Sequence, residues 1–372
     1  MSETGPPRRV VLNMAHEYTG SDGAIQVEDE PTHDRLPSDG PGGILGDSHP
    51  DPTEKPDLPR LILKSPGQGP LWVRLLGLVT LVAVTSCSAP DRSSSEYPPL
   101  PEPATAYLQP DTVRGLRVGD GAAYYYVRSG RGPWAVHLVL ADAGRCDIRG
   151  VVAPAHDGDE RHRRRVSTLR PEGPGAPFVG VNGDFFTEEG SPLGPEISTA
   201  TLMLAARPAF AWSPHAEPWI GVTEVNDGLA RFGEGHAGGS VDATGGLQVI
   251  GGFPLLLQDG SVVGDLEVSD RPAFATVRHP RTGVGYDKDT GHLWLVVVDG
   301  RQADYSSGMS LPEFAQLFNA LGVEDALNLD GGGSATMWVR GEVVNRPSDP
   351  NGERPVANSL WLTDLPGRRC ES

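Results

Sequence analysis

A turn of three consecutive glycines, Asp330-Gly331-Gly332-Gly333-Ser334, directly follows the apolar run Ala326-Leu327-Asn328-Leu329. Glycine allows backbone conformations that a Cβ would exclude, and successive backbone N–H groups in such a turn can converge on an anion. Asp330 adds a carboxylate beside these donors, and Ser334 adds a hydroxyl. The segment therefore predicts a site for an anionic ligand, although it lacks the glycine spacing and the lysine of the common nucleotide-binding loops.

Two further carboxylates stand at the ends of apolar runs. Asp184 lies in the segment Val179–Phe186, after an apolar stretch that ends in Asn-Gly, and Asp299 follows the run His292–Val298. Strand ends and the loops after them are typical positions for catalytic acids and bases. Asn-Gly-Asp and Asp-Gly are also common turn sequences. For both residues a purely structural role therefore stays open.

Short β-rich runs separated by turn residues surround these segments. Alternating or continuous apolar residues bounded by glycine, serine or aspartate predict β-strands and hairpins. A nearly continuous apolar run such as His292–Asp299 is typical of a strand buried on both faces. The predicted strands are Ala122–Arg128, Trp134–Ala141, Leu247–Leu257, His292–Asp299, Thr336–Arg340 and Glu342–Asn345.

One helix is strongly indicated. Ser310 and Glu313 fit a capping box, with a proline in the first turn where its missing N–H costs little. Apolar residues over Leu311–Leu321 recur at the spacing of a helix that faces a core, and Gly322 provides the stop. Strands outnumber helices, and hairpins alternate with helical crossovers. We therefore expect an α+β fold, a mixed β-sheet flanked by helices in a single domain.

Composition and charge narrow the classes of function. The 372 residues include 48 Gly and 35 Pro, which favours a chain rich in loops and strands over a helical bundle. The net charge is −18, with 31 basic residues against 49 acidic ones. No block of Lys and Arg is long enough to follow a phosphate backbone, so we expect no nucleic-acid partner.

The N-terminal region has the composition of an export signal rather than of a folded domain. Leu71 to Val84 combines an arginine with a short apolar stretch, and Val84-Thr85-Ser86-Cys87 resembles a bacterial lipobox in which Cys87 is lipidated. We expect translation to start at Val73; a real disordered extension before an anchor helix is the alternative. The expected organisation is an extension or gene-model artefact over 1–72, a lipoprotein signal peptide over 73–87, a Pro- and Ser-rich tether over 88–111, a folded domain over 112–366 and a tail over 367–372.

The cysteine count agrees with export. With Cys87 lipidated, Cys146 and Cys370 remain as an even pair on an exported chain. A disulfide between them and two free thiols are both open at this stage. No Cys-x-x-Cys or His/Cys cluster is present, so we expect no metal site and no cofactor.

A set of motifs follows one order along the chain and covers most of residues 165–362. They are VNGDFF (181–186), PLG (192–194), GGFPLLLQDG (251–260), HPRTGVGYD (279–287), VVVDGR (296–301), SSGMSLPEFAQLFNALG (306–322), ALNLDGGGSATM (326–337) and GERPVANSL (352–360). In type and order this set resembles the phosphodiester glycosidase family. One departure is Glu196-Ile197-Ser198-Thr199, where the family pattern has an Asp-Gly turn after PLG.

The resemblance implies hydrolysis of a sugar-1-phosphodiester at the glycosidic C–O bond. A carboxylate can attack or stabilise the oxocarbenium-like sugar, and we expect this from Asp330 first, then Asp184, then Asp299. The phosphate needs fixed donors, for which Arg281, Arg354 and the glycine amides are the candidates. The implied substrate-binding residues are Asn182, Arg281, Thr282, Asn328, Gly331, Gly332, Gly333, Ser334 and Arg354. Of these, Asn182, Thr282 and Asn328 could instead hold the carboxylates.

We expect an exported lipoprotein on the outer face of a bacterial cell membrane, anchored through Cys87 and acting on sugar-phosphate glycans of the envelope. Exopolysaccharides, teichoic-type polymers and lipid-linked sugars are the candidate substrates. Two alternatives stay open. One is a glycan-binding lipoprotein without catalysis, and the other is a metal-dependent phosphodiesterase that cleaves the P–O bond. The latter would need clustered metal ligands, whereas His279 is the only histidine within the motifs.

Overall fold

The computed structural model describes residues 97–365, apart from 157–159, 172–174, 199–201, 215, 227–228, 232–245, 264–265 and 267–270. The expected N-terminal extension, the signal peptide with Cys87 and the C-terminal tail with Cys370 lie outside the described residues. Of the helices in the described part, none has the length and apolar character that crossing a membrane requires.

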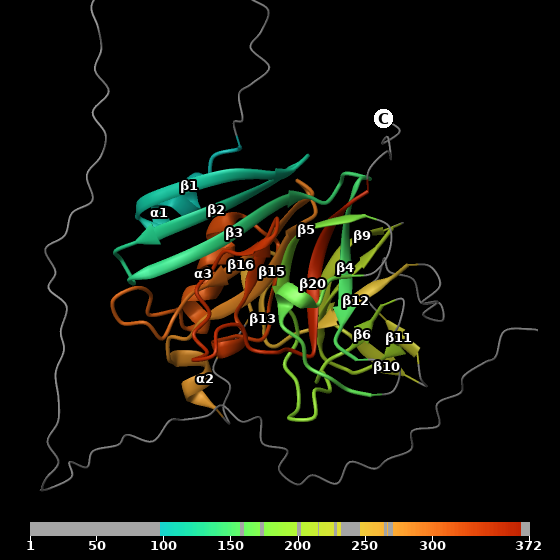
Figure 1. The fold of residues 1–372 in the computed structure, drawn as a ribbon. Helices are drawn as coiled ribbons and strands as arrows, with labels where there is room; N and C mark the ends of the chain where they lie inside the picture. Colours follow the sequence, from blue (N-terminus) through green and yellow to red (C-terminus); the bar gives the residue numbers. More distant parts are fainter. Residues whose placement is uncertain are drawn as a thin grey trace, which may run out of the picture. The chain divides into compact units, whose positions relative to one another are not determined.

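The largest sheet in the described part has eight strands and is shown in Figure 1. Each strand forms antiparallel pairs with its neighbours. In spatial order the strands are β1 (Pro110–Gly119), β2 (Ala122–Ser129), β3 (Trp134–Asp142), β16 (His292–Val298), β15 (Arg281–Asp287), β17 (Asp325–Asn328), β13 (Leu255–Gln258) and β14 (Ser261–Val262).

Smaller antiparallel sheets complete the described fold. One five-stranded sheet has the order β19 (Glu342–Val343), β18 (Met337–Val339), β5 (Ala176–Asn182), β20 (Asn358–Asp364) and β4 (Ile148–Pro154). Another has the order β7 (Leu202–Met203), β6 (Glu196–Ile197), β12 (Gln248–Gly251), β8 (Pro208–Ser213) and β9 (Ala216–Val222). A two-stranded ribbon pairs β10 (Glu224–Asn226) with β11 (Leu229–Arg231).

The expectation of a mixed sheet is wrong, because the strand pairs of the described part are antiparallel. The helical crossover does exist: α3 (Leu311–Leu321) connects β16 to β17. Both strands pair antiparallel with β15, so they run parallel to each other, yet β15 lies between them. The fold is mostly β, with few helices.

Two apolar cores hold the layers together. On one face of the eight-stranded sheet, residues such as Leu138 and Val296 pack against Phe314 and Leu317 of α3. On its other face, alternate residues pack against the five-stranded sheet that contains β5 and β20. The eight-stranded sheet therefore lies between a helical layer and a second sheet, and a strand buried on both faces reads as continuously apolar.

The folded part begins earlier than expected. Residues 88–111 read as a tether, but α1 (Glu102–Leu108) forms within this range. Its Ala104 and Leu108 are fully buried, four residues apart, on the face that joins the core around α3. The Pro-rich composition is compatible with this short helix, because Pro103 stands in its first turn.

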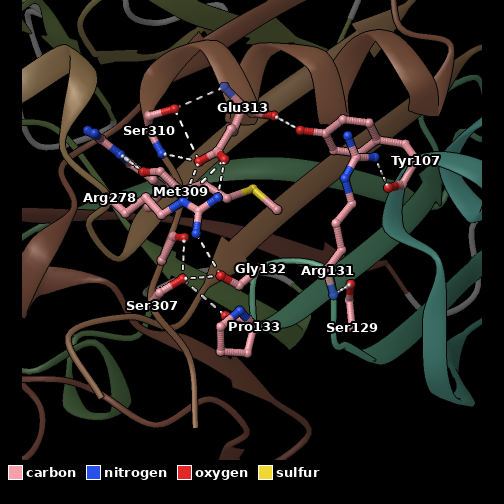
Figure 2. A network of polar contacts seen from close by, with 12 residues as sticks. Tyr107, Ser129, Arg131, Gly132, Pro133, Arg278, Ser307, Met309, Ser310 and Glu313 are labelled. Atoms are coloured by element: carbon pink, nitrogen blue, oxygen red, sulfur yellow. Dashed lines mark hydrogen bonds and ion pairs between the residues drawn. The ribbon is translucent and has the colours of Figure 1, made fainter. Parts of the chain in front are cut away.

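The N-terminus of α3 is the centre of a polar network (Figure 2). As predicted, Ser310 and Glu313 form a capping box. At the other end of the helix, Gly322 is in the left-handed region at φ 80°. Arg278 donates to both carboxylate oxygens of Glu313 and also to the carbonyl of Gly132, at 2.6 Å. These contacts fasten the start of α3 to the entry of β15 and to the turn between β2 and β3.

One predicted strand is two. The run Leu247–Leu257 forms β12 and β13, which belong to different sheets. The strand is interrupted at Gly252-Phe253-Pro254, because proline has no backbone N–H to donate to a neighbouring strand. A Cβ on Gly252 would lie 2.6 Å from the Asn328 carbonyl oxygen, so only glycine allows this close approach.

Candidate active site

The ends of two strands from different sheets bring Asp184 and Asp330 together. β5 ends at Asn182 and β17 ends at Asn328, each two residues before an aspartate. The backbone N–H of Asp330 donates to the carbonyl of Gly183 at 2.9 Å. The two carboxylates that the sequence ranks first are therefore neighbours, and the negative charge of Asp330 raises the pKa of Asp184.

Asp184 is enclosed by backbone. Its side chain is 1% exposed, and its oxygens accept hydrogen bonds from the N–H of Phe185 at 2.8 Å and of Gly194 at 2.5 Å. Burial raises the pKa of Asp184 to about 7; the charge of Arg207 and the two amides oppose this shift only in part. Close to neutral pH this carboxyl is therefore partly protonated.

Two glycines make this enclosure possible. A Cβ on Gly194 would lie 2.8 Å from Oδ2 of Asp184, and a Cβ on Gly251 would lie 2.6 Å from the same oxygen. Both distances are too short for any real side chain. Gly194 ends the PLG motif and Gly251 begins the GGFP motif, so these segments form the walls around Asp184.

Asp330 differs from Asp184 because it is half-buried. Loss of water around the carboxylate raises its pKa to about 6. The neighbouring Ser334 hydroxyl, the Gly331 N–H at 2.9 Å and the charges of Arg354 and Arg301 limit the shift. At pH 7 Asp330 is mostly ionised, whereas Asp184 retains much of its proton.

The amides of the glycine turn were expected to bind an anion, but most of them donate to acceptors within the protein. The N–H of Gly331 donates to the Asp330 carboxylate, and the N–H of Gly332 donates to the Pro280 carbonyl at 2.9 Å. Two of the three amides therefore already have acceptors, and the expected nest of three free donors is not formed. A Cβ on Gly333 would lie 2.6 Å from the Arg354 guanidinium, so this glycine makes room for a cation.

The side-chain amide of Asn182 is hydrogen-bonded to other parts of the protein, so it is not available to a sugar hydroxyl. Its Nδ2 donates to the carbonyl of Asp330 at 2.6 Å, and its Oδ1 accepts from the Thr282 hydroxyl at 2.8 Å and the Thr336 N–H at 3.1 Å. Asn182 and Thr282 are fully buried. Of the two roles that were open for them, the contacts support holding a catalytic carboxylate in place.

Asn328 has one amide atom committed and one without a partner. Its Nδ2 donates to the carbonyl of Phe253 at 2.7 Å. Its Oδ1 is buried and has no hydrogen-bond partner among the described residues. Buried acceptors are normally paired, so this oxygen is suited to a hydroxyl of a substrate or to a water molecule.

Arg281 was expected to bind phosphate, but its guanidinium is buried and hydrogen-bonded within the protein. The side chain is 2% exposed, and its guanidinium donates to the carbonyls of Met309 at 2.8 Å, Phe274 at 2.8 Å and Val277 at 3.2 Å. Burial, helped by the charge of Arg301, lowers its pKa to about 9. Arg281 therefore holds the entry of α3 and the short helix α2 (Pro272–Thr276) and does not face a substrate.

Two other arginines face Asp330. Arg354 donates to Asp349 at 3.0 Å and lies against Gly333, as the close approach of its guanidinium shows. Arg301, which is exposed and has a positive φ of 58°, lies 3.2 Å from the Cβ position of Gly332. Arg354 was predicted, but Arg301 was not. The sequence signal that could have identified Arg301 is its position directly after Asp-Gly at the end of a buried strand.

Asp299 lies in a separate buried network. Its carboxylate accepts from Tyr305 at 3.1 Å, Asn345 at 3.0 Å and the Arg346 N–H at 3.0 Å, and it pairs with His137 at 3.1 Å. At 1% exposure it has little surface for a substrate. Of its two open roles, the contacts support the structural one: Asp299 joins the loops that carry Arg301 and Arg346.

A second buried carboxylate supports Asp184 from behind. Asn358 accepts the N–H of Asp184 at 2.9 Å and donates to Glu196 at 2.6 Å. Glu196, which is fully buried, also pairs with His156 at 3.5 Å. Glu196 is the residue where the sequence departs from the expected Asp-Gly turn, and neither it nor Asn358 was among the predicted site residues.

The remaining predicted features are a disulfide and the absence of a metal. Cys146 is disulfide-bonded, but Cys370 lies outside the described residues, so their pairing stays a prediction. In the part of the chain that the structure describes, no three His, Cys, Asp or Glu side chains gather as metal ligands.

Comparisons with known proteins add the family. Residues 177–363 match the family model described as phosphodiester glycosidase. A bovine (Bos taurus) relative, N-acetylglucosamine-1-phosphodiester alpha-N-acetylglucosaminidase, is 28% identical over 216 residues, which are 54% of this chain and 38% of that protein. A SPbeta prophage-derived uncharacterized protein of Bacillus subtilis, YomE, is 39% identical over 91 residues, 24% of this chain and 14% of that one.

The fold also has a solved counterpart. The crystal structure of a hypothetical protein from Synechocystis superposes with a TM-score of 0.52 at 18% identity, covering 68% of this chain and 64% of that one. Such a likeness concerns the fold. The chain spans well under half the length of the bovine relative that it matches.

Proposed function

Because the chain belongs to the phosphodiester glycosidase family, we propose that it hydrolyses sugar-1-phosphodiesters at the glycosidic C–O bond. The products are a free sugar and a phosphomonoester. The name of the bovine relative, an enzyme of N-acetylglucosamine-1-phosphodiesters, supports N-acetylglucosamine as the first sugar to test.

The observation that carries the proposal is the setting of Asp330. It is a half-buried carboxylate, ionised at neutral pH, with the guanidinium groups of Arg301 and Arg354 close enough to lower its pKa. A sugar-1-phosphodiester has a sugar carbon that becomes cationic and a phosphate that stays anionic. One carboxylate beside two cations matches both ends of that bond.

The chemical step follows from this arrangement. The C1–O bond breaks, its electron pair leaves with the phosphate oxygen, and positive charge develops on the sugar ring. Asp330 acts on C1 as a nucleophile or as the base that removes a proton from the attacking water. Arg301 and Arg354 stabilise the charge on the leaving phosphate. Since a phosphate leaves readily, the site needs no strong acid beside that oxygen.

Asp184 sets the charge of the site. As long as it holds its proton, Asp330 is the one negative charge of the pair, and an anionic substrate can approach. Ionisation of Asp184 would add a second negative charge and repel the phosphate. We therefore assign Asp184 as a positioning residue that acts through charge and through the backbone of Phe185 and Gly194.

The proposed place of action is the cell envelope. The apolar segment before Cys87 supports export and lipid anchoring on the outer face of a bacterial membrane, and sugar-phosphate glycans of the envelope fit this location.

The decisive experiment is hydrolysis in oxygen-18 water by the full chain, with Asp330→Asn as control. The substrates are a panel of sugar-1-phosphodiesters that starts with N-acetylglucosamine 1-phosphodiesters. Mass spectrometry of the products should find the label in the released sugar, which means C–O cleavage. Label in the phosphate means P–O cleavage and a phosphodiesterase. Binding without turnover of any substrate would make the protein a glycan-binding module.

A further inference from the structure

Two arginines outside the candidate active site converge on one tyrosine. The guanidinium carbons of Arg128 and Arg346 lie 4.9 Å and 5.3 Å from the ring centre of Tyr305, and Arg128 also donates to the Tyr305 carbonyl. Arg128 belongs to β2, whereas Arg346 follows β19, so the fold brings them together from distant parts of the sequence. Cations over an aromatic face are attracted to it, but they also repel each other.

Neither cation is neutralised. Within the described residues, no carboxylate lies at ion-pair distance from Arg128 or Arg346. The carboxylate of Asp299 accepts the Tyr305 hydroxyl, but it is buried and paired with His137. Although the net charge of the chain is −18, these two neighbouring guanidinium groups form no ion pair within the described residues. An anionic ligand would relieve their repulsion.

The pair is attached to the candidate active site through one loop. Tyr305 lies four positions after Arg301, so their Cα atoms lie within about 14 Å of each other. The loop is closed by hydrogen bonds between Gln302 and Ser306, and the side chain of Gln302 donates to the carbonyl of Arg346 at 2.9 Å. The buried Asp299 fixes the Arg346 N–H as well. The second pair of cations is thus held near Arg301 by rigid contacts.

We propose that Arg128, Tyr305 and Arg346 form a second anion subsite, which binds a further phosphate of a substrate that carries several. This inference rests on the proposed function and deepens it. The preferred substrate is a chain of sugars joined by phosphodiesters, with one phosphate at Arg301 and Arg354 and a neighbouring phosphate at Arg128 and Arg346. Each guanidinium can offer two N–H groups to a phosphate.

The test gives the full chain two substrates built from N-acetylglucosamine 1-phosphate units, one with a single phosphodiester and one with three in a row. We expect kcat/KM to be about tenfold higher for the longer substrate at 50 mM salt, and the preference to fall as salt is raised. Arg346→Ala and Arg128→Ala should remove the preference while leaving the short substrate within about twofold. Lys288→Ala removes an exposed cation that follows the end of β15 opposite Arg281; it is the matched control and should keep the preference.

Two outcomes overturn the subsite: equal kcat/KM for both substrates in the wild type, or an equal loss on both substrates in Arg346→Ala. The second outcome would mean that the arginine only supports the loop. If the wild type hydrolyses neither substrate, the proposed function fails, and calorimetric titration with the longer substrate decides the subsite separately. Binding that is about tenfold weaker in Arg346→Ala supports it, and equal binding overturns it.

Discussion

The backbone N–H of Asp330 donates to the carbonyl of Gly183, the residue before Asp184, at 2.9 Å. This one hydrogen bond joins the ends of two strands that belong to different sheets. It places two carboxyls within reach of each other's charge, with pKa values of about 6 for Asp330 and about 7 for Asp184. Two neighbouring carboxyls with different environments are the usual way in which one site obtains two protonation states.

Asp330→Asn should abolish turnover and leave the fold intact. The substitution keeps the size of the side chain but removes the charge that acts on the sugar, so we expect kcat to fall by about 10²–10⁴-fold. Steady-state kinetics and circular dichroism check both parts. Asp304→Asn, an exposed acid in the loop after Arg301, is the control and should keep full activity. Wild-type turnover by Asp330→Asn would remove that residue from the mechanism.

The pH dependence of kcat/KM should be bell-shaped. Activity should rise through pH 6 as Asp330 ionises and fall above pH 7 as Asp184 loses its proton and repels the anionic substrate. In Asp184→Asn the alkaline fall should disappear, because the second negative charge can no longer form. A fall that persists unchanged in this variant would contradict the role assigned to Asp184.

Replacing Arg281 with alanine should lower the stability of the protein, whereas replacing Arg301 should raise KM. Arg281→Ala leaves three buried carbonyls without their donor, so we expect the protein to lose about 3 kcal/mol or more of unfolding free energy. Arg301→Ala should leave stability nearly unchanged and raise KM about tenfold. Urea denaturation and kinetics of both variants distinguish these effects. A large change in KM with unchanged stability in Arg281→Ala would restore the phosphate contact expected from the sequence.

Local features of this chain were predictable, whereas features that depend on tertiary contacts were not. The capping box at Ser310 and the stop at Gly322 are confirmed, because both depend on residues within one helix. Strands with strong apolar patterns, such as His292–Val298, are confirmed for the same reason. Arg281 was misjudged because the three carbonyls around it come from segments that only the fold brings together. Glu196 and Asn358 were missed since a buried polar pair has no periodic signal.

Gly251→Ala tests the wall around Asp184. The added Cβ would lie 2.6 Å from Oδ2 of Asp184 and 2.7 Å from the Cα of Gly194, and backbone on that side cannot easily move. We expect a loss of about 1–3 kcal/mol in unfolding free energy and a clear drop in activity. Gly119→Ala is the matched control, because its Cβ would meet its neighbours at 3.7 Å or more. Equal behaviour of the two variants would contradict the close packing at Gly251.

Stability should increase when the pH is lowered from 8 to 5. The folded pKa values of Asp184 and Asp330 are raised above that of a free aspartate, so the native state binds more protons than the unfolded state in this range. Stability from these groups is present at low pH and is lost as the pH rises through about 6 and 7. We expect a difference of about 1–3 kcal/mol, measured by urea denaturation. The double variant Asp184→Asn/Asp330→Asn should show a smaller dependence, and an unchanged one would contradict the assignment.

The side chain of Asn182 makes the active site sensitive to the relative position of two sheets. Its amide nitrogen binds the segment that carries Asp330, and its amide oxygen binds Thr282 of the eight-stranded sheet and Thr336 beside β18. Hydrogen bonds weaken steeply when their length or angle changes, so a small slip of one sheet past the other would break several of them together. Activity should therefore be lost before the strands unfold, so a measurement of activity reports small changes in the relative position of the two sheets.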